Sequence, residues 1–387
     1  MDEHIKKVMF LDKSNIFAGA EYCLLSLCNN LDLLKFKVSL VFDYPKKHHK
    51  KYRENNTPVS YRNSKLKFWM GTDYSLKNIR GADLFKRIIF SFQLAYIIYK
   101  NKIDIFHINL LRSTDYLDVK IAKFMGCKVI GHVRSLESQA HIKTSSLNAC
   151  DYVLATSEYV LNEINRPNIA IPLKRIYDPI DINDYNTSLI DKDEIRNKYG
   201  IEKYNFVISS IAILDKRKGH ETAIKAFSEV LKVKPNCKLL VAGGRLNENN
   251  NEKIRLQKIA DGLNLGDKII FTGHVDKVVD IFAITDLVLA LSSDGEAFGR
   301  IPLEAASSKK VVIATNLGAT PEIVVDKITG FLVKPNDPME VFKLVYSLMN
   351  SKDEMKRISE NAYSHVFKNF SAKIHSKLVQ EVYASLN

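Results

Sequence analysis

The chain has 387 residues, of which 46% are hydrophobic and 26% are charged, and its formal net charge is +13. This length is too great for one ordinary hydrophobic core, so it predicts two α/β domains. No stretch approaches the roughly 20 apolar residues of a membrane-spanning helix, and the start, MDEHIKKVMFL, lacks the apolar run of a secretory signal. The five cysteines lack metal-ligand spacing, which indicates reduced thiols in a cytoplasmic protein.

Positive charge is concentrated in the first half of the chain. Residues 1–183 contain 28 Lys/Arg and 18 Asp/Glu, whereas the remainder contains 29 and 26. Within residues 46–102 the numbers are 14 and 3. This excess has two interpretations: a solvated surface, or binding to an anionic membrane lipid or acceptor. No nucleic-acid-binding motif accompanies the charge, so nucleic acid is not expected as a partner.

Short apolar strands alternate with helical patterns, which is typical of parallel-sheet α/β domains. After the first strand, AEYCLLSLCNNLD places apolar residues at helical spacing. A polar stretch then interrupts the pattern and predicts a linker at 184–203, between an N-terminal domain at 1–183 and a C-terminal domain at 204–368. The expected strands are 7–11, 37–42, 103–108, 128–132 and 152–156 in the first domain, and 206–213, 238–242, 268–271, 287–291, 311–314 and 330–333 in the second.

Helices of the second domain are expected to begin near His220, Asn251, Val278, Ile301 and Thr320. The last fifty residues look helical, with a turn near 369–371, so a terminal helix is expected at 369–387. In open parallel sheets, ligands bind at the carboxyl ends of the strands. We therefore expect two Rossmann-like domains that face a central cleft.

The most informative segment is SSDGEAFGRIPLEAASSKKVVIATNLGATPEIV, which begins at Ser292. It reads as a strand end, a turn with Gly295 and Gly299, and a helix. The glycines allow backbone to approach a ligand closely, and the helix N-terminus offers free N–H groups to phosphate. Glu304 is suited to accept hydrogen bonds from ribose hydroxyls. Taken alone, Glu296 and Glu304 are more often structural residues.

This segment resembles the donor-site motif of retaining GT-B glycosyltransferases, specifically glycosyltransferase family 4. That motif has two glutamates separated by seven residues, and Glu296, Phe298, Gly299, Glu304 and Ala305 match it. Downstream, NLGATPEIV resembles the family's Gly-Gly-x-x-Glu turn and ITGFLV its Thr-Gly-x-Leu-Val strand. The resemblance extends over nearly the whole chain, through AGAE, CDYVLATSEYV, RIYDPIDI, FTGHVDKVVDIFAITDLVLALS and FSAKIHSKLVQEVYASL, although Asp178 stands where Asn is usual.

LDKRKGHETAIKAF resembles the segment that supplies the cation for the donor diphosphate. Lys218 fits this role, whereas the usual arginine five positions earlier is replaced by Ile213, so Arg217 or Lys216 is a candidate substitute. Lys309 and Val311, where Gly and Pro are common, also depart from the pattern. The resemblance implies that these residues bind the donor: Gly19, Ala20, Arg217, Gly273, His274, Val275, Phe298, Gly299, Arg300 and Glu304.

Polar residues end two strands of the first domain, His107 with Asn109 and His132 with Arg134, each pair on one face. VIGHVRS resembles an acceptor-side segment of the family. The resemblance therefore implies that Glu296, Lys218 and His132 act in catalysis, and that His107, Asn109 and Arg134 lie on the acceptor side. Glu137 and Arg112 are weaker candidates, and His48 and His49 are interpreted as surface residues.

The resemblance implies a retaining transfer of a hexosyl or N-acetylhexosaminyl group from a nucleotide-sugar, with UDP favoured over GDP. The acceptor is expected to be a glycan or lipid-linked molecule of bacterial envelope polysaccharide synthesis. The resemblance also implies that no Asp-x-Asp metal motif is needed, because cations and backbone amides replace the metal, so neither a metal nor another cofactor is expected. Two alternatives remain: a non-catalytic GT-B sugar- or lipid-binding protein, and an NAD oxidoreductase, which would need a Gly-x-Gly-x-x-Gly fingerprint.

The same charge pattern also predicts where in the cell the protein works. In residues 46–102 aromatic side chains alternate with the basic ones. Basic groups can meet anionic headgroups while rings enter the interface. We expect a cytoplasmic protein that associates peripherally with the inner face of the membrane. The aromatic residues concerned are Tyr52, Tyr61, Phe68, Trp69, Tyr74, Phe85 and Phe90.

Overall fold

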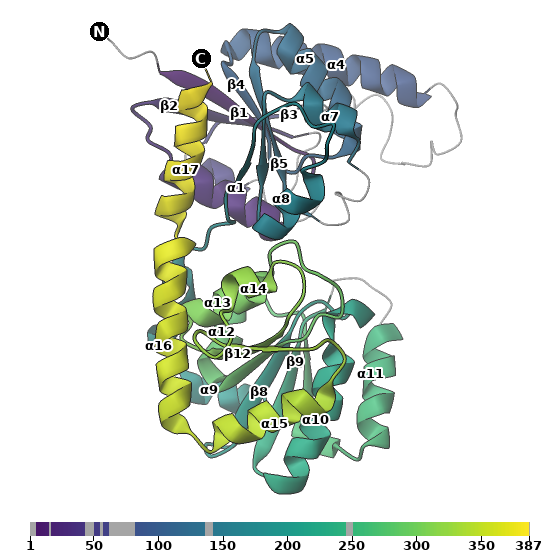
Figure 1. Ribbon diagram of the computed structural model, residues 1–387, viewed down its shortest axis with the longest axis vertical. Helices are drawn as coiled ribbons and strands as arrows, with labels where there is room; N and C mark the ends of the chain where they lie inside the picture. The colour runs from purple at the N-terminus through teal and green to yellow at the C-terminus, as the bar shows by residue number, and fades with distance from the viewer. Residues whose placement is uncertain are drawn as a thin grey trace. The chain divides into compact units, whose positions relative to one another are not determined.

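The computed structural model describes residues 5–14, 17–42, 50–54, 57–61, 82–135, 142–244 and 251–386. The chain forms two compact units (Figure 1). The first contains Met1–Pro179 and Ala372–Asn387, and the second contains Ile180–Ser371. The chain thus passes from one unit to the other twice, and at the second unit's border Ile180 N–H donates to Phe370 O at 2.9 Å.

The first unit has a seven-stranded sheet in the order β3-β2-β1-β4-β5-β6-β7, with every neighbouring pair parallel. All five predicted strands form. The sequence did not predict β3 and β7, which are three-residue strands at the two edges. The strands are β1 Lys6–Asp12, β2 Phe36–Phe42, β3 Val59–Tyr61, β4 Ile105–Ile108, β5 Lys128–Val133, β6 Tyr152–Ala155 and β7 Leu173–Arg175.

A helix from the C-terminal part of the chain completes the core of this unit. Val379, Val382 and Tyr383 are buried with residues of β1, β2 and the helix after β1. Lys6 Nζ also donates to the carbonyl of Tyr383 at 3.0 Å. The terminal helix, expected at 369–387, lies here at 372–385. The helices of the unit are α1 Gly19–Asn30, α2 Lys50–Glu54, α4 Ala82–Asn101, α5 Tyr116–Phe124, α7 Thr144–Ala149, α8 Glu158–Ile164 and α17 Ala372–Ser385.

The second unit has a six-stranded parallel sheet in the order β10-β9-β8-β11-β12-β13. All six predicted strands form. The strand order changes direction between β8 and β11, and such a change creates a ligand site at the carboxyl ends of the strands. The strands are β8 Phe206–Ile211, β9 Cys237–Ala242, β10 Ile269–Gly273, β11 Leu287–Ala290, β12 Val311–Thr315 and β13 Phe331–Val333.

Helices of the second unit begin as predicted at four of the five positions, and the fifth begins one residue early, at Arg300. Residues 184–203, expected as a linker, belong to this unit and pack against its helix α12. The described helical segments are η4 Ile182–Tyr185, η5 Thr187–Leu189, α9 Lys192–Lys198, η6 Lys216–Lys218, α10 His220–Val233, α11 Asn251–Gly262, η7 Gly266–Lys268, α12 Val278–Ile284, α13 Arg300–Ser307, α14 Thr320–Ile323, α15 Pro338–Met349 and α16 Lys352–Asn369.

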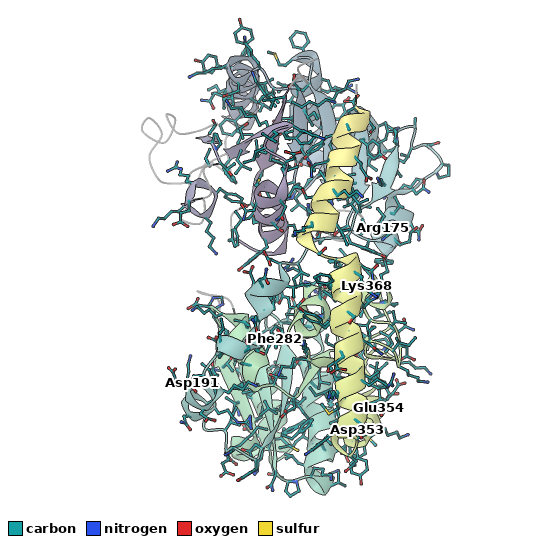
Figure 2. All side chains as sticks on the ribbon, turned by 90° about the vertical axis from the view of Figure 1, so that its left-hand side faces the viewer. Arg175, Asp191, Phe282, Asp353, Glu354 and Lys368 are labelled. Atoms are coloured by element: carbon teal, nitrogen blue, oxygen red, sulfur yellow. The ribbon has the colours of Figure 1, made fainter. Side chains whose placement is uncertain are left out.

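Local charge and capping explain where two of these helices begin or end in the sequence. Asp353 and Glu354 occupy the first turn of α16 and Lys368 its last turn, a distribution that matches the helix dipole (Figure 2). Asp191 caps α9 by accepting from the backbone N–H groups of Asp193 and Glu194. These ends are encoded locally, although α9 falls within 184–203, where a linker was expected.

Candidate functional site

Three loops of the second unit build a candidate site at the carboxyl ends of neighbouring strands β8, β11 and β12. The first loop carries Lys218 on η6, directly before α10. The second carries Glu296, between β11 and α13. The third is the turn that contains Gly318, between β12 and α14. Residues that are distant in sequence therefore meet because their strands are adjacent.

Lys218 and Glu296 are in direct contact. Lys218 Nζ lies 2.5 Å from Glu296 Oε1, and the Ser292 hydroxyl donates to the same oxygen at 2.6 Å. The side chains are 24% and 29% exposed, so both remain open to solvent. The structure thus pairs two residues, 78 positions apart, that the sequence had assigned to one site.

Two glycines permit the close packing of these loops. At Gly219 (φ +72°) a Cβ would lie 1.8 Å from the carbonyl oxygen of Leu291. At Gly318 (φ +58°) it would lie 2.5 Å from both the backbone N and O of Glu296. Ala319 N–H also donates to Glu296 O at 2.9 Å. The NLGAT turn therefore holds the backbone that carries Glu296.

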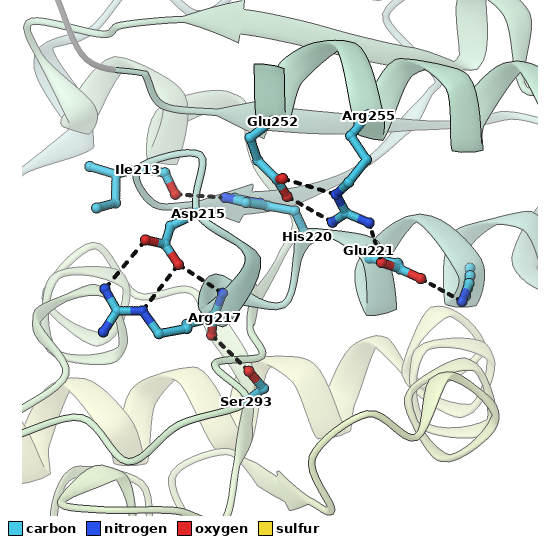
Figure 3. A network of polar contacts seen from close by, with 9 residues as sticks. Ile213, Asp215, Arg217, His220, Glu221, Glu252, Arg255 and Ser293 are labelled. Atoms are coloured by element: carbon cyan, nitrogen blue, oxygen red, sulfur yellow. Dashed lines mark hydrogen bonds and ion pairs between the residues drawn. The ribbon is translucent and has the colours of Figure 1, made fainter. Parts of the chain in front are cut away.

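Arg217, which precedes Lys218 in the chain, is held by the carboxylate of Asp215, as Figure 3 shows. Its Nε and Nη2 lie 3.1 and 3.3 Å from the two Asp215 oxygens, and its backbone N–H donates to Asp215 Oδ1 at 2.9 Å. These hydrogen bonds from Arg217 lower the pKa of Asp215. The Arg217 carbonyl accepts from Ser293 N–H at 2.8 Å, which ties this loop to that of Glu296. The Arg217 side chain is 47% exposed.

Ile213 contributes its backbone rather than a charge. Its carbonyl oxygen lies 3.2 Å from His220 Nε2 (Figure 3). His220 Nδ1 lies 2.8 Å from the Ser210 hydroxyl. His220 is buried, and burial lowers its pKa. This arrangement fixes the start of α10. Whether Arg217 or Lys216 replaces the missing arginine stays a prediction.

Glu304 is a buried carboxylate, 8% exposed. Arg300 Nε donates to its Oε1 at 3.1 Å, and the Tyr185 hydroxyl donates to it as well. Burial raises the pKa of Glu304, whereas the charge of Arg300 and both hydrogen bonds oppose the rise. Tyr185 was not predicted, because it lies in a polar stretch without a motif and meets Glu304 only through folding.

The other predicted donor residues lie around these loops. Phe298 is buried, and its ring centroid lies 5.8 Å from that of Phe370. Gly299 precedes α13 with φ +54°, and Gly273 ends β10 with φ +71°. His274 Nε2 lies 3.4 Å from Asp276 Oδ1, and Val275 is half-buried. Their contact with a donor stays a prediction.

In the first unit, His107, predicted for the acceptor side, and His132, predicted for catalysis, form a buried stack of imidazoles with His375, which was not predicted. The ring centroid of His132 lies 5.8 Å from that of His107 and 6.3 Å from that of His375 on α17. His107 Nδ1 lies 2.7 Å from the Tyr383 hydroxyl. All three rings are buried, and burial, followed by the charge of Arg134, lowers the pKa of each. The roles predicted for His132 and His107 remain predictions.

Arg134 and Asn109 belong to a buried polar network. Arg134 forms an ion pair with Asp178 through Nη1 and donates from Nε to the Asn109 carbonyl at 3.1 Å. Asn109 Nδ2 lies 3.1 Å from Asp12 Oδ2 and 3.2 Å from Ala20 O. Burial raises the pKa of Asp12 to about 6. The pair with Arg134 accounts physically for an acid at 178, where the family commonly has Asn.

Gly19 and Ala20 form the first turn of α1, directly after the loop that follows β1. Glu21 closes this turn by accepting from Ala18 N–H at 2.7 Å. Arg112 is exposed, and its backbone N–H donates to Asp115 at 2.7 Å. Glu137, His48 and His49 lie outside the described residues.

Two further expectations concern metals and cysteines. Within the described ranges, no group of three or more His, Cys, Asp or Glu side chains is arranged to hold a metal ion. The prediction of metal-independent chemistry stays a prediction. All five cysteines are buried, and none of them forms a disulfide. Across the same ranges, no helix has the length and apolarity needed to cross a bilayer.

Comparisons with known proteins identify relatives of this architecture. Residues 191–365 match the family model for glycosyl transferases group 1. The chain is 28% identical over 231 residues to the N-acetyl-alpha-D-glucosaminyl L-malate synthase of Bacillus anthracis, covering 59% of this chain and 58% of that protein. It is 24% identical over 242 residues to the lipopolysaccharide core biosynthesis mannosyltransferase LpsB of Rhizobium meliloti, covering 61% and 66%. The aligned regions thus span about half to two thirds of these relatives.

A solved structure covers almost the whole chain. The Anabaena protein Alr3699/HepE, solved in complex with UDP, superposes with a TM-score of 0.81 at 20% identity, over 98% of this chain and 100% of that one. At this identity the likeness establishes the fold.

Proposed function

Because the chain belongs to the group 1 glycosyl transferases and has the GT-B fold, we propose that it transfers a sugar from a nucleotide-sugar to a hydroxyl group of a glycan or lipid-linked acceptor. One observation carries this proposal. Lys218 and Glu296 meet at 2.5 Å, at the carboxyl edge of the second sheet, on loops fixed by two glycines. In the proposed transfer, the cation would neutralise the departing diphosphate and the carboxylate would bind the donor sugar.

The basic and the acidic residues of the site have different proposed roles. Lys218 and Arg217 would stabilise the negative charge that develops on the departing diphosphate, together with helix N-termini. Glu296 would accept hydrogen bonds from the donor sugar, and Glu304 from the ribose. Because these groups orient the donor and neutralise the leaving group, the transfer needs no protein nucleophile, and we propose that it proceeds with retention.

A UDP-sugar is the proposed donor. The Anabaena protein of the same fold was solved with UDP, and the B. anthracis relative is named for a glucosaminyl transfer. We expect a hexosyl or N-acetylhexosaminyl group. Calorimetric titration with UDP, GDP, ADP and dTDP tests the base: UDP should bind most tightly, and equal affinity for all four would remove the support for this choice.

The acceptor proposed is a precursor of envelope polysaccharide, handled at the inner face of the cytoplasmic membrane. This proposal is supported by the R. meliloti relative, whose name places it in lipopolysaccharide core synthesis, and by the basic first half of the chain. A test is UDP release from UDP-sugars in the presence of extracted lipid-linked glycans. Release that is stimulated by neither lipid-linked nor free glycans would contradict a transferase role.

A non-catalytic sugar-binding protein is the second candidate, favoured by Ile213, Lys309 and Val311 at positions where the family has other residues. The two candidates differ in turnover. A binding protein would bind UDP-sugar stoichiometrically and leave it intact. A transferase would at least hydrolyse it slowly in the absence of acceptor.

A further inference from the structure

The helix α4 exposes a row of aromatic rings. Phe92, Tyr96 and Tyr99 are 74%, 63% and 74% exposed. Their spacing of four and three residues puts them on one face of the helix. On the opposite side, Leu94 and Ile98 are fully buried. The helix therefore already has a core-facing stripe, and the aromatic row is a second apolar stripe that the fold of this unit does not use.

The neighbouring helix α5 adds to this surface. It packs against α4, and it exposes Leu117 (45%) and Phe124 (90%), which are seven residues apart and share a face. A contiguous exposed apolar surface on a folded protein marks an interaction site. We refer to Phe92, Tyr96, Tyr99, Leu117 and Phe124 together as the α4–α5 face.

The exposed charges beside this face are positive. Lys100, Lys102 and Lys120 are exposed, and Lys120 Nζ lies 5.5 Å from the centre of the Tyr116 ring. Lys123 is compensated by Asp151 at 3.0 Å. Among the described side chains of the two helices, the acid is Asp118, which is buried and paired with Lys13. A partner for this surface must be apolar and carry negative charge.

We propose that the α4–α5 face is the surface by which the first unit docks onto an anionic lipid bilayer. Aromatic rings enter the headgroup region while lysines reach the phosphates around them. This inference rests on the proposed function at the membrane and assigns the surface that contacts the bilayer. The α4 part of this face is the end of the basic segment 46–102, but its rings are not the ones expected there to enter the interface. Tyr52 of that segment is buried and donates to Glu21 O at 3.0 Å. Phe68, Trp69 and Tyr74 lie outside the described residues, and Phe90 is half-buried.

The test is co-sedimentation of the full chain with phosphatidylcholine vesicles, with and without phosphatidylglycerol, at low and moderate salt. The wild type should bind the anionic vesicles and lose affinity as salt screens the lysines. Phe92→Ser, Tyr96→Ser and Tyr99→Ser combined should lower partitioning by at least about tenfold, the scale for withdrawing several apolar side chains from a lipid interface. Lys100→Gln and Lys120→Gln should each cost about fivefold.

Matched controls come from the second unit. Tyr204→Ser removes an aromatic ring that is 86% exposed, and Lys258→Gln removes an exposed lysine of α11. Both should bind vesicles like the wild type. UDP binding by calorimetry is measured on every variant and should not change, so a failure of docking is distinguishable from a failure of the proposed donor site.

Three outcomes would overturn the proposal. The wild type shows no binding to anionic vesicles at low salt. The α4–α5 variants bind as tightly as the controls, which would assign the docking to another surface. Alternatively, light scattering shows a wild-type dimer that the triple variant dissociates, with vesicle binding unchanged, which would make the face a self-association surface.

Discussion

Lys218 is the residue on which the proposed chemistry depends most. Lys218→Ala should reduce turnover by about 10²-fold or more, because it removes one preorganised charge from the departing diphosphate. The measurement is UDP release from a UDP-sugar under saturating donor. Lys225→Ala is the matched control, since Lys225 lies on α10 and pairs with Glu221 at 2.6 Å. A nearly wild-type Lys218→Ala with an inactive Arg217→Ala would show that the adjacent arginine holds the leaving group.

Glu304 provides a prediction about pH. Ribose hydroxyls need the ionised carboxylate as acceptor, and burial raises its pKa, so donor affinity should fall as the pH drops through that raised value. Tyr185→Phe removes a hydrogen bond that opposes the rise. The pKa of Glu304 should therefore increase further, and affinity should be lost at a higher pH than in the wild type. UDP titrations over a range of pH measure this shift.

Removing the Glu304 carboxylate gives the largest loss of UDP affinity expected in these titrations. Glu304→Ala should weaken UDP binding by about 1–3 kcal/mol, the cost of lost charged hydrogen bonds. Its affinity should also lose the acid limb of the pH profile. If Tyr185→Phe weakens UDP equally at every pH, Tyr185 supports the fold rather than the ionisation of Glu304.

At the scale of elements, the turn between β12 and α14 controls the position of Glu296. Gly318→Ala should lower kcat/KM and destabilise the fold by about 1–3 kcal/mol, because it adds left-handed strain and a Cβ that would lie 2.5 Å from the Glu296 backbone. Denaturant unfolding and UDP release measure the two effects. Gly262→Ala is the control, since its Cβ meets nothing within 4 Å. Equal behaviour of the two variants would contradict the role given to the turn.

The same elements explain what the sequence can and cannot predict. Apolar strands such as β1 and β9 and amphipathic helices such as α10, which begins at His220 as expected, are encoded locally, so they were predicted correctly. The edge strands β3 and β7 have three residues each and take their order from neighbours. Asp178 pairs with Arg134, 44 positions away, and no local sequence pattern predicts such an ion pair. Glu296 and Glu304 could be identified from the sequence because one short stretch of the chain contains the whole motif.

At the scale of the whole molecule, the prediction concerns metals. Transfer should survive EDTA, because Lys218, Arg217 and helix N-termini supply the positive charge that a metal would otherwise provide. The measurement is product formation with EDTA and, separately, with added Mn²⁺ or Mg²⁺. Loss of activity in EDTA and its return with either ion would contradict the proposed metal-free chemistry.

The placement of α17 in the first unit has a consequence for how the protein is made. Tyr383 and Val379 belong to the core of a sheet whose strands end before residue 180. A ribosome must therefore synthesise the 192 residues of Ile180–Ser371 before that core can close, which takes roughly 10–40 s at bacterial-like rates of elongation. Meanwhile the nascent first unit exposes apolar surface that chaperones would bind. A chain truncated before Ala372 would lack α17, so the hydrophobic core of the first unit would stay incomplete.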